Sequence, residues 1–128
     1  MTSLLVLSHG HKVAAAVEEL VRELSPNTSV FSVGGTKDGA AGADYDGMQE
    51  KLNEALTLGD VIILYDLGST LMTIQTVMDE LPEDELKKVH LSNAALVEGA
   101  IAASVCFAAE MDAEDIIAEL EALSVDKA

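Results

Sequence analysis

Short apolar runs alternate along the chain with longer stretches in which apolar residues recur every three or four positions. The runs are rich in β-branched residues and cover residues 3–7, 29–33, 61–65 and 89–91. Apolar runs of this length, bounded by turn residues, predict four buried β-strands. The stretches between them carry the helical period and predict helices over residues 12–24, 45–58, 69–81 and 93–110, with a last one after residue 112.

Turn and capping residues mark where these helices are expected to begin and end. Pro26 stops the first helix, and Gly59 follows the second as a glycine C-cap would. Pro82 ends the third, because proline cannot continue a helix. Ser69 is expected to cap the start of the third helix, and Asp112 the start of the last.

Strands that alternate with helices indicate βαβ crossovers, and therefore a parallel sheet covered on both faces. The predicted fold is α/β, a three-layer α-β-α sandwich around a mainly parallel four-stranded sheet. If the third strand lies beside the first, the strand order is the flavodoxin-like 2-1-3-4. A chain of 128 residues suits one core, so a single domain over 1–128 is expected.

The apolar content is high for a domain of this size. Apolar residues make up 49% of the chain, with a mean hydropathy of +0.27. The predicted helix 93–110 is apolar on nearly all sides apart from Glu98. Such a helix suits burial against both the sheet and a second subunit, so a homo-oligomer is expected.

Charge and cysteine content narrow the range of partners and compartments. The formal net charge is −16, which disfavours nucleic acid and anionic membrane surfaces. The single cysteine, Cys106, lies in an apolar stretch, so no intrachain disulfide forms and a reduced, cytoplasmic environment is expected. Neither a signal peptide nor a stretch long enough for a membrane span is recognised.

Chemistry-bearing residues follow the first three predicted strands. They form the three turns Ser8-His9-Gly10, Gly34-Gly35-Thr36 and Asp66-Leu67-Gly68-Ser69-Thr70. Because carboxyl ends of parallel strands meet at one edge, His9 and Asp66 are expected to be neighbours. A carboxylate can accept the proton of one imidazole nitrogen and leave the other nucleophilic. Backbone N–H groups at the start of the third helix could hold an anion there, as could the hydroxyls of Ser8, Thr36, Ser69 or Thr70.

Several chemistries are compatible with a histidine in this position. His9 could accept a phosphoryl group, act as a general base, or be structural, and the turn at Asp66 could be only a tight turn with a helix cap. Serine hydrolysis is disfavoured because no serine lies in a Gly-x-Ser-x-Gly elbow, and neither Walker A nor Gly-x-Gly-x-x-Gly is present. His9-Gly10-His11 lacks the further ligands of a metal site, so no metal is expected.

The same turns resemble one family over almost the whole chain. Four motifs carry the likeness, in order and at matching spacing: Ser8-His9, Gly34-Gly35-Thr36, Asp66-Leu67-Gly68-Ser69 and Leu96-Val97-Glu98-Gly99-Ala100. They resemble the mannose-type enzyme IIA domains of the bacterial phosphoenolpyruvate-dependent phosphotransferase system (PTS). Within that family, they are most similar to the branch that serves dihydroxyacetone kinases.

The resemblance implies that His9 takes a phosphoryl group from the phosphocarrier protein HPr, with Asp66 as the supporting residue. It implies that the recipient is ADP on the kinase's nucleotide-binding subunit, while another subunit binds dihydroxyacetone. No tightly bound cofactor is then needed in this chain, and a homodimer is implied. We predict that His9 attacks through Nε2 to give tele-phosphohistidine, and that Thr36, Gly68 and Ser69 contact the phosphoryl oxygens.

Two positions depart from the family pattern. Ala43-Asp44 stand after Gly42 where hydroxyl residues are common, and Gly10 replaces a serine often seen after the histidine. Two alternatives stay open at this point. One is an enzyme IIA of a mannose-family sugar transporter, which would pass the phosphoryl group to a IIB domain. The other is a non-catalytic regulatory module on a flavodoxin-like scaffold.

Overall fold

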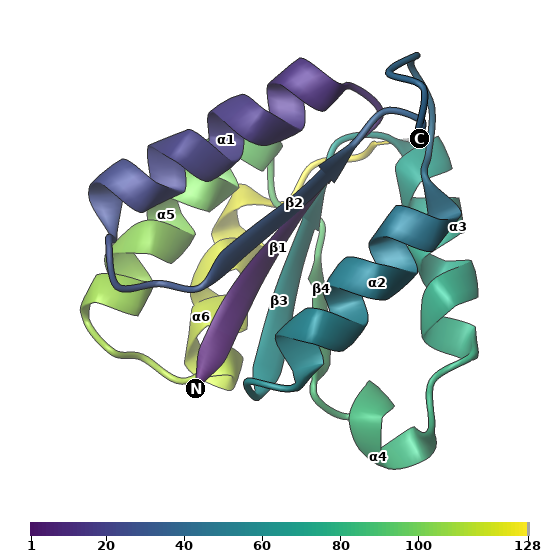
Figure 1. The fold of residues 1–128 in the computed structure, drawn as a ribbon. Coiled ribbons are helices and arrows are strands. Elements are labelled where there is room, and N and C mark those ends of the chain that lie inside the picture. The colour runs from purple at the N-terminus through teal and green to yellow at the C-terminus, as the bar shows by residue number, and fades with distance from the viewer. Residues whose placement is uncertain (128) are drawn as a thin grey trace.

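Four parallel strands form the centre of the structure, a computed structural model that describes residues 1–127 (Figure 1). The elements in chain order are β1 (Thr2–Ser8), α1 (His11–Leu24), β2 (Val30–Gly34), α2 (Tyr45–Leu56), β3 (Asp60–Tyr65), α3 (Gly68–Asp79), α4 (Glu83–Leu86), β4 (Val89–Ser92), α5 (Leu96–Ala108), α6 (Ala113–Leu120) and the 3-10 turn η1 (Glu121–Leu123).

The predicted topology is confirmed. The sheet has the order β2-β1-β3-β4, and every neighbouring pair is parallel. Central strand β1 pairs on both sides, so that Leu4 is in register with Val30 of β2 and Ile62 of β3. Helices α1, α5 and α6 cover one face, and α2 and α3 cover the other (Figure 1). The carboxyl ends of all four strands therefore lie along one edge.

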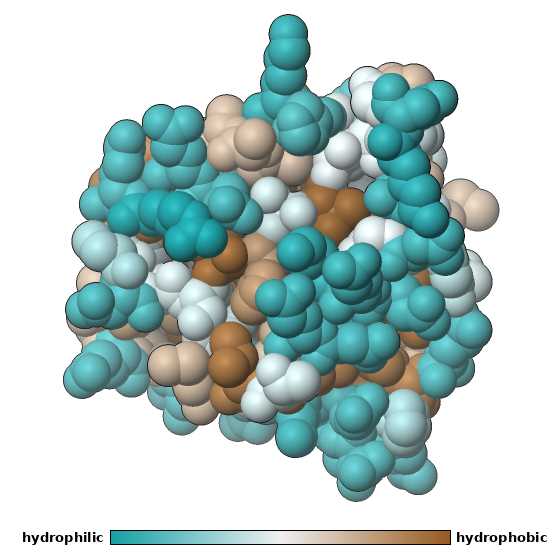
Figure 2. All heavy atoms as spheres, viewed as in Figure 1, coloured by the Kyte–Doolittle hydropathy of each residue, from teal (hydrophilic) through white to brown (hydrophobic). Residues whose placement is uncertain are grey.

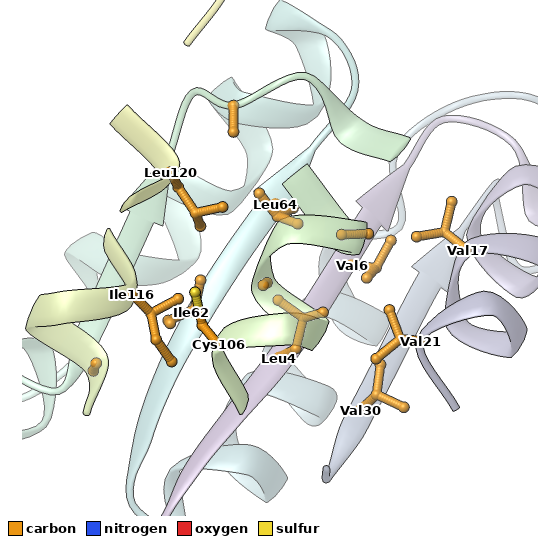
Figure 3. Close-up of a cluster of buried hydrophobic side chains, with 14 residues drawn as sticks. Leu4, Val6, Val17, Val21, Val30, Ile62, Leu64, Cys106, Ile116 and Leu120 are labelled. Carbon is orange, nitrogen blue, oxygen red and sulfur yellow. The ribbon is translucent and has the colours of Figure 1, made fainter. Parts of the chain in front are cut away.

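Alternating residues of the strands build a separate core on each face of the sheet. Leu4 and Val6 of β1 point towards α1 and α5, whereas Leu5 and Leu7 point towards α2 and α3. All four are fully buried, as expected for a central strand covered on both sides. The first of these cores, which contains Leu4 and Val6, is drawn in Figure 3, with the strand residues between the side chains of α1 and α6.

Most predicted helix ends are confirmed to within a few residues, but the cap assigned to Ser69 is wrong. Helix α3 begins at Gly68 with Leu67 in the N-cap position, so Ser69 lies inside the first turn. Asp112 does cap α6, and its carboxylate accepts a hydrogen bond from the N–H of Asp115 at 3.1 Å. Pro82 stands at the N-cap of α4, a four-residue helix that the sequence pattern did not predict.

The segment after η1 returns to the carboxyl edge of the sheet. Ser124 forms an antiparallel bridge with Ala94, and the N–H of Val125 donates to the carbonyl of Asn93 at 3.0 Å. These pairings use the backbone just after β4, and α5 accordingly begins at Leu96 rather than at the predicted residue 93. Figure 1 shows the yellow segment passing the ends of the strands towards α3.

The surface is largely polar in the view of Figure 2. Hydrophilic side chains cover the outer faces of α1 and α2, and hydrophobic residues are visible between them. Among the helices of residues 1–127, none has the length and apolar character needed to cross a bilayer.

Candidate functional site

The turns after β1 and β3 meet at the carboxyl edge of the sheet, as predicted. The two strands are neighbours, with Leu7 in register with Tyr65, so His9 and Asp66 follow matching ends. The His9 Nδ1 atom lies 2.6 Å from the Asp66 Oδ2 atom. The structure therefore brings the two predicted residues into direct contact.

Asp66 is the centre of the site and uses both carboxylate oxygens as acceptors. Besides His9 Nδ1, Oδ2 accepts from the hydroxyl of Ser8 at 2.8 Å and the backbone N–H of His9 at 3.0 Å. Oδ1 accepts from the backbone N–H of Leu67 at 2.7 Å and the hydroxyl of Thr70 at 2.8 Å. Donors from both turns thus hold the carboxylate in one orientation.

These donors keep Asp66 ionised. Burial acts to raise the pKa of Asp66, but the hydrogen bonds from the His9 side chain and backbone, from Ser8 and from Thr70 outweigh it. Together they lower the pKa of Asp66 from 3.8 to about 2. Asp66 is therefore a carboxylate at neutral pH and can only accept hydrogen bonds.

The state of Asp66 fixes the tautomer of neutral His9. A carboxylate has no proton to donate, so the short contact requires the hydrogen on Nδ1 of the ring. The Nε2 atom then carries the free lone pair. The His9 side chain is 44% exposed and Asp66 only 12%, so the ring is open to a partner while its support is shielded. This arrangement suits a nucleophilic Nε2.

The backbone around His9 is held by the neighbouring glycine loop. The carbonyl of His9 accepts from the N–H of Gly42 at 2.9 Å, and the Ser8 hydroxyl accepts from the N–H of Gly10 at 3.0 Å. Gly34 ends β2 directly against this turn. A Cβ atom added there would lie against the Gly10 carbonyl and 2.7 Å from the Ala14 side chain. The loop thus positions His9 through close backbone approach.

The three residues predicted to contact phosphate lie on two sides of the site. Gly68 and Ser69 form the first turn of α3, directly after Asp66 and Leu67, where N–H groups lack acceptors within the helix. The Thr36 hydroxyl instead donates to the side chain of Asp38 within its own loop. Phosphate binding by Thr36, Gly68 and Ser69 stays a prediction.

Sequence reasoning assigned Ser8 and Thr70 a different role. Both hydroxyls were grouped with candidate anion ligands, whereas the structure directs them to the oxygens of Asp66. Thr70 is fully buried and follows Asp66 by four residues, which places it one helical turn below the carboxylate. This spacing of four residues in the sequence could have predicted the hydrogen bond between Thr70 and Asp66.

The loop residues that depart from the family pattern also have a structural role. Asp44 caps α2, and its carboxylate accepts from the N–H of Gly47 at 2.9 Å. The position therefore starts a helix instead of contributing a hydroxyl. As for metals, the described residues include no cluster of three His, Cys, Asp or Glu side chains that could bind one.

Comparisons with known proteins all point to one family. A family model described as the PTS system fructose IIA component matches residues 3–120. The phosphoryl donor subunit DhaM of PEP-dependent dihydroxyacetone kinase 1 from Listeria innocua is 34% identical over 120 residues, which cover 94% of this chain and 93% of that one. The phosphotransferase subunit DhaM of the PTS-dependent dihydroxyacetone kinase from Lactococcus lactis is 29% identical, over 97% of each chain.

A solved structure extends the likeness to three dimensions. The crystal structure of a protein of unknown function shares 31% of its residues with this chain and superposes with a TM-score of 0.86. The match covers 98% of this chain and 96% of the other. The similarity therefore includes the whole sheet and the turns at its carboxyl edge.

Proposed function

Because the chain belongs to the mannose-type enzyme IIA family of the PTS, we propose that it is the phosphocarrier subunit of a PTS-dependent dihydroxyacetone kinase. Its activity would be that of a phosphotransferase, as in the relatives named DhaM. Those names favour a kinase subunit over a sugar-transporter component or a non-catalytic module. The observation that carries the proposal is the 2.6 Å contact between His9 Nδ1 and Asp66 Oδ2, with the other ring nitrogen left free.

The proposed reaction begins on the exposed edge of the imidazole. The lone pair of His9 Nε2 attacks the phosphorus of a donor phosphohistidine, and the donor N–P bond breaks with its electron pair left on the donor nitrogen. The Nδ1 proton stays between His9 and Asp66, which keeps the ring oriented throughout. Such a transfer depends on alignment and charge stabilisation, which a shallow site can supply. The N–H groups of Gly68 and Ser69 would face the transferred phosphoryl oxygens.

The proposed partners are a protein that donates the phosphoryl group and a kinase subunit that receives it. HPr is the phosphoryl donor, and the recipient is ADP held on the nucleotide-binding kinase subunit, while a separate subunit binds dihydroxyacetone. ADP and ATP would thus reside on the partner, and this chain would need no tightly bound cofactor of its own. We place the relay in the cytoplasm, where its partners act.

A homodimer is part of the same proposal. Three apolar side chains spaced four residues apart along α5 are exposed to solvent: Val97 at 47%, Ile101 at 42% and Val105 at 65%. An apolar stripe on the outside of an α/β domain is typical of a subunit interface. This stripe supports the predicted second copy of the chain.

Reconstitution tests the function directly. The chain is mixed with phosphoenolpyruvate, Enzyme I and HPr, and then with the two kinase subunits, ADP and dihydroxyacetone. We expect acid-labile, base-stable phosphate on the wild-type chain and consumption of dihydroxyacetone only when the chain is present. His9→Ala should accept no phosphate, whereas His11→Ala, which removes an exposed histidine two residues away, should behave like wild type. Labelling of the His9→Ala protein would contradict the proposal.

A further inference from the structure

Lys127 reaches the functional site from the far end of the described chain. Its Nζ atom donates to the carbonyl of Tyr65 at 2.5 Å and to the carbonyl of Ala94 at 2.5 Å. Nζ also lies 4.2 Å from the centre of the Tyr65 ring, within the range of a cation–π contact. Tyr65 immediately precedes Asp66 in the chain. The ammonium group of Lys127 is therefore hydrogen-bonded to the residue next to the central carboxylate of the site.

The position of Lys127 is set by paired backbone just before it in the chain. The bridge between Ser124 and Ala94, and the bond from Val125 to Asn93, fix the segment that carries it. The Tyr65 hydroxyl donates to the Asn93 side chain at 2.6 Å, which joins the end of β3 to the same segment. The hollow beside them is lined by Tyr65, Gly68, Leu71, Asn93, Val125, Asp126 and Lys127.

The charge of Lys127 interacts with that of Asp66. Burial lowers the pKa of Lys127, and the negative charge of Asp66 opposes this by favouring the protonated amine. An amine with two carbonyl acceptors, an aromatic face and a nearby carboxylate is well placed to remain an ammonium ion. Lys37, in the loop after β2, is by contrast paired with Asp46 at 2.7 Å.

The proposed phosphoryl transfer changes the charge that Lys127 faces. The transferred unit is formally PO₃⁻: the donor N–P bond breaks, the His9 Nε2–P bond forms, and the proton remains on Nδ1. The site therefore gains one negative charge on top of that of Asp66. A fixed cation nearby lowers the free energy of this more anionic state more than that of the resting state.

We propose that Lys127 is a positioning residue of the relay, which holds the end of β3 next to Asp66 through the Tyr65 carbonyl and favours phosphorylated His9 through its charge. The inference rests on the proposed function of His9. It assigns a role to a residue 118 positions further along the chain, as the numbering of His9 and Lys127 gives. Neither residue type nor spacing linked Lys127 to the site in the sequence.

Three substitutions separate the charge of Lys127 from its hydrogen bonds. Lys127→Arg keeps the charge and the donors, Lys127→Gln keeps a donor without charge, and Lys127→Met keeps neither. Lys88→Met is the control, because Lys88 is exposed at the amino end of β4, away from the site. The measurement is the equilibrium partition of phosphate between each variant and unmodified HPr, read by ³¹P NMR at low and high salt. Circular dichroism confirms that each variant is folded.

The expected result divides the variants into two groups by charge. Lys127→Arg and Lys88→Met partition like wild type, whereas Lys127→Gln and Lys127→Met shift phosphate towards HPr by about three- to tenfold. The difference in phosphate partition between these two variants and wild type should shrink at 1 M salt, where the screening length is about 3 Å. A loss confined to Lys127→Met, or equal partition in every variant, would overturn the inference. Absence of His9 phosphate in wild type would instead overturn the proposed function.

Discussion

At the scale of single residues, the site depends on the number of hydrogen bonds that the Asp66 carboxylate accepts. Asp66 accepts from three side chains and two backbone N–H groups, and two of the side chains, Ser8 and Thr70, are themselves buried. Hydrogen bonds to a charged acceptor are stronger than those between neutral groups. Asp66 thus holds the two turns together and orients His9 at the same time.

Replacing Asp66 with asparagine should affect both roles. An amide lacks the charge that fixes the Nδ1 proton, so Asp66→Asn should slow phosphoryl transfer from HPr by about 10²-fold. Quench-flow labelling with phosphorylated HPr measures the rate. The opposite result, an unchanged rate, would mean that Asp66 only shapes the turn.

The pH dependence of stability gives a second readout of the same substitution. Because folding lowers the pKa of Asp66 from 3.8 to about 2, the carboxylate contributes its full stability only above pH 3.8, and that contribution is lost as the pH falls through about 2. Wild type should therefore unfold at higher urea than Asp66→Asn at pH 7, and the difference should disappear towards pH 2. Asp84→Asn, which changes an exposed carboxylate of α4, is the control. A pH-independent difference would contradict this assignment.

The sequence predicted the pair His9 and Asp66 because strand order alone brings two matching strand ends together. It did not predict the partners of Asp66, because a hydroxyl near a strand end can turn towards an anion or a carboxylate equally well. Lys127 was not predicted at all. Its place depends on the antiparallel bridge between Ser124 and Ala94, a long-range pairing without local periodicity.

At the scale of elements, the turn after β1 depends on a close approach between two loops. Gly34 ends β2 where the first turn of α1 passes, and Gly35 beside it has a φ of +74°, a conformation that side chains rarely adopt. The pair lets β2 end against the Gly10 carbonyl. Gly34 and Gly35, which the sequence marked as a turn, therefore set the distance between β2 and α1.

Gly34→Ala should push the end of β2 away from α1. Its Cβ would lie against the Gly10 carbonyl and 2.7 Å from the Ala14 Cβ, so α1 must shift, at a cost of about 1–3 kcal/mol in the free energy of unfolding. Gly10→Ala is the matched control, since its nearest contact would be 3.7 Å away, in ordinary van der Waals range. Urea unfolding measures both variants. Equal stability of the two would show that the approach is not tight.

Element boundaries show where periodicity stops being informative. The long helices were predicted from repeats of apolar residues, and the buried faces of α1 and α2 confirm them. Helix α4 has only four residues and none of them is buried, so it has no apolar stripe to detect. The cap of α3 was misassigned because the helix begins at Gly68, one residue before Ser69, with Leu67 at the N-cap and no side-chain cap hydrogen bond.

At the scale of the whole molecule, two surface properties oppose each other. The net charge of −16 makes copies of the chain repel, whereas the exposed stripe of Val97, Ile101 and Val105 favours association. Salt screens the repulsion between the charged copies but does not weaken the apolar contact. Association through α5 should therefore strengthen as the salt concentration rises.

A charge placed on this apolar stripe tests the dimer. Val105 is the most exposed of the three residues, at 65%, and Val105→Glu would put an unpaired carboxylate into any interface formed by α5. Sedimentation equilibrium should give about twice the 13.4 kDa chain mass for wild type and the single-chain mass for the variant. Leu58→Glu is the control, because Leu58 is 41% exposed after α2, on the opposite side of the sheet. Because His9 and Asp66 lie in one chain, monomeric Val105→Glu should still accept phosphate; a variant that stays dimeric would place the interface elsewhere.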